Sequence, residues 1–199
     1  KVVIFAAPSG SGKTTLVRYL LDQIPQLRFS VSATTRSKRD HEKDGHDYYF
    51  IEKSDFVQKI QTGNFLEWQE VYDGNYYGTL CSEIDRIWAE GYSVIFDVDV
   101  VGALNIKRYY GDQALAIFVK VPSIDDLKNR LQNRETETKE SINIRLEKAA
   151  MEMDYEKDFD ISILNDQVDT AKARSLFIVE RFLQMGFAGL PGHEVQKGE

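Results

Sequence analysis

The segment from residue 7 to residue 14 constrains the fold of this chain more than any other feature. It reads Ala-Pro-Ser-Gly-Ser-Gly-Lys-Thr and follows a short, continuous apolar run at residues 2–6. After it, Leu16, Leu20 and Ile24 recur at the spacing of one helix face. A short apolar run of this kind is typical of a strand that is buried on both faces. The sequence therefore predicts a strand, a glycine-rich turn and a helix in direct succession.

This succession is the setting in which a glycine-rich loop binds phosphate. Gly10 and Gly12 let backbone N–H groups approach an anion without a Cβ in the way, and the helix N-terminus adds unpaired donors. Lys13 can reach the β- and γ-phosphates of a nucleoside triphosphate, and the Thr14 hydroxyl can hold Mg²⁺. An ordinary glycine turn would not require Lys and Thr in this register. The predicted ATP contacts in this segment are Ser9, Gly10, Ser11, Gly12, Lys13, Thr14 and Thr15.

Asp97 follows a second buried apolar run, residues 92–96. A carboxylate at the end of a strand beside a phosphate loop suits a contact with Mg²⁺, direct or through water. The alternative is that Asp97 caps the helix predicted over residues 100–110. We expect Thr14 and Asp97 to be the metal ligands, and the capping role stays open at this point.

Buried strands alternate with helical patterns along most of the chain, which predicts an α/β fold of three layers around a central parallel sheet. The predicted strands are 2–6, 27–31, 92–96, 114–121 and 161–164, and the predicted helices are 14–23, 82–90, 100–110, 123–134, one through Ile142, Leu146, Ala149 and Met153, and 170–184.

Residues 32–80 break this rhythm and predict an insertion with its own short strands, at 48–51 and 65–72. Between them we expect a helix that Ser54 caps and Gly63 ends. The wholly polar residues 135–140 predict a solvated flap. The glycine-rich segment from residue 186 onward predicts a loose tail.

Composition excludes some classes of protein. The net charge is -7, which argues against a sequence-independent nucleic-acid binder, since such proteins carry a basic face. The single cysteine, Cys81, allows no internal disulfide and suits a reducing compartment. No apolar run approaches the roughly 18 residues of a membrane span. We expect a cytoplasmic protein without nucleic-acid or membrane partners, as a monomer or small homo-oligomer.

Further motifs follow the phosphate loop in a specific order. They read Ser-Val-Ser-Ala-Thr-Thr-Arg at 30–36, Gly-His-Asp-Tyr-Tyr-Phe at 45–50, Phe-Leu-Glu-Trp at 65–68, Asn-Tyr-Tyr-Gly-Thr at 75–79, Asp-Val-Asp at 97–99 and Leu-Asn-Asp at 164–166. Together with the loop, they resemble the guanylate kinase family from Val2 to about Phe182. The resemblance implies a P-loop enzyme of purine nucleotide metabolism that transfers the γ-phosphate of ATP to GMP or dGMP, with Mg²⁺.

The resemblance also implies a domain plan. A single domain spans 1–184, with a core at about 1–31, 80–132 and 156–184. A small GMP-binding insertion with short strands covers about 32–79, and a helical lid covers about 133–155. Residues 185–199 would form a flexible tail.

By similarity, the positions that hold GMP are Ser32, Arg36, Arg39, Tyr48, Glu67, Tyr77, Thr79 and Asp99. Their chemistry agrees with that role, because Arg36 and Arg39 can clamp a phosphate dianion. Carboxylates can accept hydrogen bonds from the guanine N1–H and amino group. Adenine has a bare acceptor at N1, which a carboxylate repels. Taken alone, each of these residues would be read as an ordinary surface or core side chain.

The lid arginines of the family match Arg134 and Arg145, and Asn165 matches a residue near the ATP nucleotide. The expected catalytic residues are Lys13, Arg36, Arg39, Arg134 and Arg145. The chain departs from the family pattern at Ala7, where glycine is usual, at Lys38, where proline is usual, and at Glu135, where glycine is usual.

Two alternatives remain open on the sequence. Another small-molecule kinase would use the same phosphate loop, but Glu67 and Asp99 would then have no purpose. A non-catalytic phosphopeptide-binding module of guanylate-kinase type would tend to lose Lys13 and the base-reading residues, all of which are present here.

Overall fold

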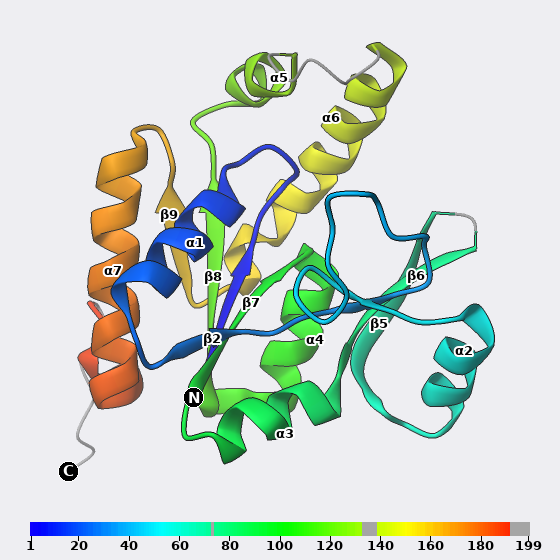
Figure 1. Ribbon diagram of the computed structural model, residues 1–199. Coiled ribbons are helices and arrows are strands. Elements are labelled where there is room, and N and C mark those ends of the chain that lie inside the picture. Colours follow the sequence, from blue (N-terminus) through cyan, green and yellow to red (C-terminus); the bar gives the residue numbers. More distant parts are fainter. Residues whose placement is uncertain (73, 133–138, 192–199) are drawn as a thin grey trace. The chain divides into compact units, whose positions relative to one another are not determined.

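The computed structural model describes residues 1–72, 74–132 and 139–191 (Figure 1). The chain forms two compact units, a larger one from residues 1–27 and the described part of 95–199, and a smaller one from residues 28–94. The domain boundaries expected from the sequence stay a prediction.

The first sheet has five strands in the order β2-β7-β1-β8-β9. Their bounds are Leu27–Phe29 for β2, Ser93–Val98 for β7, Val2–Ala6 for β1, Ala114–Lys120 for β8 and Ile161–Leu164 for β9. β8 pairs in parallel with β1 on one side and with β9 on the other. All five residues of β1 are fully buried, as expected for a central strand covered on both faces. The predicted α/β fold is confirmed.

Helices cover both faces of this sheet (Figure 1). α1 (Lys13–Gln23) and α7 (Val168–Met185) pack together on one face, while α4 (Val100–Tyr110) packs on β1 and β8 from the other. The predicted bounds of α1 and α4 agree with the structure to within one residue, because glycines 12 and 111 delimit them.

α5 (Ile124–Gln132) and α6 (Lys139–Met153) pack against each other. Ser123 caps α5, because the Asp126 N–H donates to Ser123 Oγ at 3.0 Å. Leu127, Leu131 and Ala149 form a buried cluster between the two helices. Most of the predicted flap, and Arg134 with it, lies outside the described residues.

The expectation of a loose tail from residue 186 is wrong for its first residues. Gly186–Gly189 form a short 3-10 helix, and Leu190 is only 4% exposed. Gly186 has a φ of 67°, which turns the chain back so that the Phe187 ring packs edge-on against Phe182. Arg181 holds the turn by donating to the Gly189 carbonyl at 2.7 Å. Apolar side chains after the glycine therefore outweigh its flexibility, and residues 192–199 lie outside the described part.

The smaller unit has a four-stranded sheet in the order β4-β3-β6-β5. The strands are Tyr49–Phe50 (β4), Ala33–Thr34 (β3), Asn75–Leu80 (β6) and Phe65–Tyr72 (β5), and the helices are α2 (Lys53–Gln61) and α3 (Cys81–Ala89). β6 runs antiparallel to both β3 and β5. Phe56 of α2 is fully buried and stacks on Phe65 with ring centroids 4.2 Å apart.

One local expectation for the smaller unit is wrong. Ser54 does not cap α2, because the helix begins at Lys53 and its N-cap is Glu52, whose side chain makes no capping hydrogen bond. A short strand that the sequence analysis did not predict, Ala33–Thr34, pairs with both β4 and β6. The residues after it connect β3 to β4.

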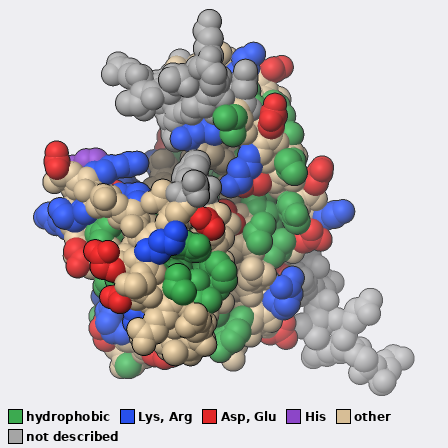
Figure 2. All heavy atoms as spheres, turned by 90° about the vertical axis from the view of Figure 1, so that its right-hand side faces the viewer, with side chains coloured by type: hydrophobic (Ala, Val, Ile, Leu, Met, Phe, Trp, Pro, Cys, Tyr) green, Lys and Arg blue, Asp and Glu red, His purple; other side chains and the backbone are tan. Residues whose placement is uncertain are grey.

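The connection from β3 to β4 supplies basic side chains to one edge of the face seen in Figure 2. Of the three histidines in the chain, only His41 and His46 are described, and both lie in this connection. The histidine colour in Figure 2 lies among Lys and Arg side chains.

Candidate functional site

The predicted phosphate loop joins the end of β1 to the first turn of α1. Gly10 and Gly12 have φ values of 95° and 87°, in the region that favours glycine. Among the described residues, no non-glycine residue has a positive φ, so Ala7 fits where the family usually has glycine. The first turn of α1 contains no acidic residue. Its N-terminus is therefore suited to an anion.

The loop is held by hydrogen bonds within itself and by side chains from later in the chain. The hydroxyl and the N–H of Ser11 both donate to the Pro8 carbonyl, at 2.7 and 3.1 Å. The Ser11 carbonyl accepts from Asn165 Nδ2 at 2.7 Å and from Arg130 at 3.4 Å. Asn165 is 4% exposed and stands at the end of β9. This residue supports the loop, and its expected contact with the nucleotide stays a prediction.

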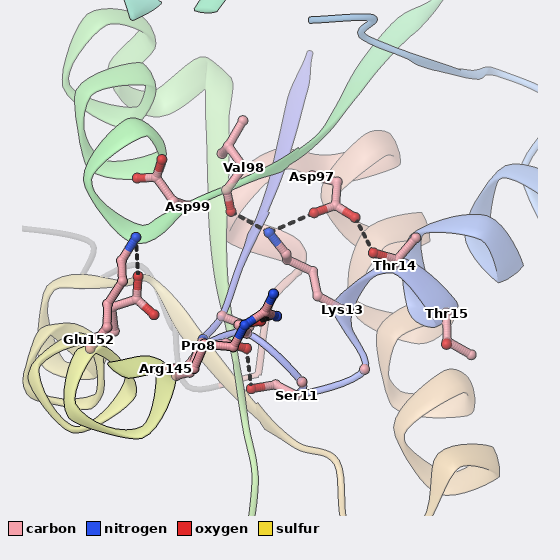
Figure 3. Close-up of a pocket in the computed structure, with 15 residues that line it drawn as sticks. Pro8, Ser11, Lys13, Thr14, Thr15, Asp97, Val98, Asp99, Arg145 and Glu152 are labelled. Atoms are coloured by element: carbon pink, nitrogen blue, oxygen red, sulfur yellow. Dashed lines mark hydrogen bonds and ion pairs between the residues drawn. The ribbon is translucent and has the colours of Figure 1, made fainter. Parts of the chain in front are cut away.

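Lys13 and Thr14 meet the end of β7 at the mouth of the loop (Figure 3). Lys13 Nζ lies 2.6 Å from Asp97 Oδ1 and also donates to the Val98 carbonyl. The Thr14 hydroxyl donates to Asp97 Oδ2 at 2.7 Å. A hydroxyl and a carboxylate are the hard oxygen ligands that Mg²⁺ prefers, and Thr14 is exposed enough to offer its oxygen to an ion. These two side chains thus fit the metal site that the sequence predicted.

The capping role considered for Asp97 belongs to Asp99. Asp97 lies inside β7, whereas Asp99 is the N-cap of α4, and its carboxylate accepts from the Gly102 N–H at 2.9 Å. Asp99 is part of the larger unit, and the other predicted GMP residues are part of the smaller one. Its reading of a base stays a prediction.

A cavity of about 390 Å³ opens over the loop. Its lining comes from the phosphate loop, the end of β7 and one face of α6. From α6 come Arg145, Lys148 and Glu152. Arg145 donates to Ser9 Oγ at 3.0 Å, so this predicted lid arginine reaches the loop.

Glu152 is the unusual member of the lining. Burial raises the pKa of its carboxyl above the usual range, against the opposing charge of Lys148, and the charge of nearby Asp99 raises it further. Its Oε1 lies 3.6 Å from Lys148 Nζ. The cavity therefore contains a carboxylate that a phosphate site does not obviously need.

The smaller unit holds a second cationic site around Arg36. Both terminal nitrogens of Arg36 donate to the carboxylate of Glu42, one of them at 2.7 Å. The guanidinium carbon lies 5.0 Å from the centre of the Tyr48 ring, and the Tyr48 and Tyr77 rings are 5.9 Å apart. Arg36, Tyr48 and Tyr77, all predicted from the sequence, thus lie together.

Glu42 anchors this second site. It is 8% exposed and also accepts from the Arg39 N–H at 2.9 Å. The hydrogen bonds from Arg36 lower the pKa of the Glu42 carboxyl to about 2, and Glu42 in turn raises the pKa of the Arg36 guanidinium. Lys38, which stands where the family usually has proline, donates to the Glu42 carbonyl at 3.1 Å.

Glu67 and Thr79 form the next pair along the sheet. They are directly opposite each other on β5 and β6, and the Thr79 hydroxyl donates to Glu67 Oε1 at 2.7 Å. Thr79 and Tyr77 are two residues apart on β6, so their side chains share a face at a spacing of about 7 Å. One face of the sheet therefore has the Tyr77 phenol beside the Arg36 guanidinium. The Glu67 carboxylate and the Thr79 hydroxyl lie about two residues further along the strands.

The remaining predicted residues are placed less specifically. Thr15 and Arg39 are exposed, and Ser32 is half-buried with its carbonyl accepting from the Tyr49 N–H at 2.9 Å. Among the described residues, no three His, Cys, Asp or Glu side chains gather into a metal-binding group. No helix in the part of the chain described here is long and apolar enough to cross a membrane.

The sequence analysis missed Glu42, Arg130, Lys148 and Glu152. Glu42 lay in a run of charged residues where every side chain looked solvated. The spacing of Lys148 and Glu152 on the helix of Arg145 was available as a signal, because residues three and seven positions on share its face.

Comparisons with known proteins place these features in one family. The family model described as Guanylate kinase matches residues 1–183. A guanylate kinase of Bacteroides fragilis is 48% identical over 183 residues, which cover 92% of this chain and 90% of that relative. A guanylate kinase of Porphyromonas gingivalis is 46% identical over 184 residues, covering 92% of this chain and 98% of that relative.

The solved structures agree. The crystal structure of guanylate kinase from Anaplasma phagocytophilum matches with a TM-score of 0.72 and 27% sequence identity. The match covers 92% of this chain and 86% of that one.

Proposed function

The chain belongs to the guanylate kinase family, and on that premise we propose that it transfers the γ-phosphoryl group of ATP to the phosphate of GMP, giving ADP and GDP. The observation that carries the proposal is the sheet face of the smaller unit. There, Arg36 with Tyr48 and Tyr77 suits a phosphate, and Glu67 with Thr79 suits the donor edge of guanine. The phosphate loop of the larger unit suits the triphosphate.

The reaction is an in-line attack of a GMP phosphate oxygen on the γ-phosphorus of ATP. A phosphate monoester has a second pKa near 6, so the nucleophile is already ionised at neutral pH and needs no general base. The protein has to align two polyanions and offset charge on the transferred group. Lys13, Arg36 and Arg145 are suited to this work by their positions in the two sites. The exposed Arg39, and Arg134 outside the described residues, are further candidates.

The supporting residues keep these cations in place. Glu42 holds the Arg36 fork, and the loop keeps its shape through Asn165 and Arg130. Thr14 and Asp97 would hold Mg²⁺, which when bound offsets phosphate charge. Asp99 is proposed as a second acceptor for guanine, with its carboxylate shared with the cap of α4.

The test is an ADP-release assay with ATP and one acceptor at a time, using GMP, dGMP, AMP, CMP, UMP and a phosphorylated sugar. We expect turnover with GMP and dGMP and little with the others. Turnover with a sugar phosphate alone would instead assign another small-molecule kinase. No turnover with any acceptor, together with binding of a phosphopeptide, would assign a binding module.

A further inference from the structure

The phosphate cavity contains a charged pair that the proposed reaction does not use. Arg145, Lys148 and Glu152 are three and then four residues apart on α6, so they lie on one face of the helix. All three line the cavity over the phosphate loop. Figure 3 shows Glu152 pointing from α6 toward the side of the cavity where Asp99 lies.

The pair is poorly explained as a stabiliser of α6. Lys148 precedes Glu152, which is the less favourable order for a pair four residues apart on a helix. The two charged atoms are 3.6 Å apart, and the Lys148 side chain is 60% exposed. Exposed pairs of this kind contribute little to stability. The Glu152 side chain is only 13% exposed, so its carboxylate is largely removed from water. Removing a charge from water costs free energy, and the weak pair with Lys148 offsets little of that cost.

The charges of the cavity suggest what the pair does. Of the lining carboxylates, Asp97 is bonded to Lys13 and Thr14, and Asp99 caps α4. Glu152 is left near the place where a triphosphate would bind, and it would repel that ligand unless a cation stayed beside it. Lys148 is that cation, and its long stem lets the ammonium group contact both Glu152 and a phosphate oxygen.

We infer that Lys148 is a further phosphate-binding residue, which contacts the triphosphate of ATP together with Lys13 and Arg145, and that Glu152 is its positioning residue. The inference rests on the proposed function only for the identity of the triphosphate. It needs no acceptor and no transfer step.

If Lys148 binds phosphate and Glu152 positions it, Glu152→Gln should have opposite effects on triphosphate affinity in the parent and in the Lys148→Met variant. With Lys148 present, Glu152→Gln frees the ammonium group from its position and weakens binding. With Lys148→Met, the remaining Glu152 is an unbalanced anion, so Glu152→Gln relieves repulsion and strengthens binding. Such coupling between neighbours is what a double-mutant cycle measures.

The experiment measures the Kd of a non-hydrolysable ATP analogue with Mg²⁺ by calorimetry, without any acceptor. We expect Lys148→Met to raise the Kd about tenfold, the loss of one charge-assisted contact. Glu152→Gln alone should raise it about threefold, and in the Lys148→Met background it should lower it. Matched controls are Lys157→Met and Glu147→Gln, which remove exposed charges outside the cavity lining and should leave the Kd unchanged.

Each other outcome overturns part of the inference. An unchanged Kd in Lys148→Met would remove Lys148 from the phosphate site. Tighter binding by Glu152→Gln in both backgrounds would leave Glu152 as a simple source of repulsion, and equal weakening in both would leave it a structural role. Because no acceptor is present, these results stand apart from a failure of the enzyme to phosphorylate GMP.

Discussion

The cationic sites of the two units are built alike, but their carboxylates have different further partners. In the larger unit, Lys13 lies 2.6 Å from Asp97, and in the smaller unit Arg36 forms a two-point contact with Glu42. The burial of the two pairs is similar, with side chains 16% and 15% exposed in the first and 15% and 8% exposed in the second. In each pair, the cation is held in an ion pair with a largely buried carboxylate.

The partners of the two carboxylates differ. Asp97 also accepts from Thr14 and is the proposed metal ligand, so its bond to Lys13 has to loosen when a nucleotide with Mg²⁺ binds. Glu42 accepts from Arg36 and from the Arg39 N–H of its own loop, so it can stay with Arg36 while other donors of the guanidinium face a phosphate. Under the proposed function, the first pair is exchanged on binding, whereas the second organises its site in advance.

Lys13→Met should have the largest effect and would test the exchange. We expect kcat to fall about a thousandfold, because a cation that offsets charge on the transferred group is lost. The thermal midpoint should be measured beside kcat, because Asp97 keeps its hydrogen bond from Thr14 but loses its cation. The assay is ADP release with ATP and GMP, with Arg18→Met on the exposed face of α1 as control. A kcat near that of the parent would remove Lys13 from catalysis.

Arg36→Met comes next and addresses the second pair. The charge-assisted contact with the phosphate would be lost, so kcat/KM for GMP should fall about a hundredfold. The KM for ATP should stay within about twofold, since the phosphate loop is untouched. Arg36→Lys keeps the charge without the fork and should recover only part of the loss. If ATP kinetics changed as much as GMP kinetics, Arg36 would not be specific to the acceptor.

Glu67→Ala should raise the KM for GMP about tenfold, because an acceptor for the guanine donors is removed. The KM for ATP serves as the internal control. Glu67→Gln should also weaken the exclusion of AMP, measured as the ratio of kcat/KM for the two acceptors. An effect seen only with ATP would show that Glu67 does not read the acceptor base.

Glu42→Gln should raise the KM for GMP about fivefold, since a contact that loses its supporting partner is weakened rather than removed. Neither kcat nor the KM for ATP should change comparably. Equal effects on both substrates would mean that Glu42 serves the fold of the smaller unit and does not preorganise Arg36.

The smallest effect concerns acid stability. The pKa of Glu42 is lowered to about 2 from 4.5, so its contribution to folding is fully present above pH 4.5. That contribution is lost as the pH falls through about 2. The difference in free energy of unfolding between the parent and Glu42→Gln should therefore shrink over this interval, as urea midpoints at several pH values would show. A constant difference would mean that the Arg36–Glu42 pair does not set the pKa.

Much of the larger unit could be predicted from its sequence, because its signals are local. The apolar run of β1 and the glycines at 10 and 12 delimit the loop. The position of Asp97 after another apolar run indicated that its carboxylate lies beside Thr14, and the hydrogen bond between them confirms this. The capping role left open for Asp97 could not be decided from the sequence, because residues 97 and 99 both precede α4 and only the backbone shows that Asp99 is the N-cap.

The smaller unit was harder to predict, since its signals depend on pairing. β6 is mostly aromatic and small residues, and it becomes a strand by lying between β3 and β5. Glu42 is buried only because Arg36, six residues earlier, turns back onto it. The place of Glu152 in the cavity was not predicted, because its neighbours Lys13 and Asp99 are more than fifty residues away in sequence.

The support of the phosphate loop from β9 has a consequence for biosynthesis. The Ser11 carbonyl is held by an amide 154 residues further along the chain, and a Cβ at Gly12 would lie 2.4 Å from that same amide nitrogen. During synthesis the loop leaves the ribosome 154 residues before the side chain that shapes it. A nascent chain would therefore acquire a competent nucleotide site only after residue 165 has emerged, and fragments ending before residue 165 should bind triphosphate poorly.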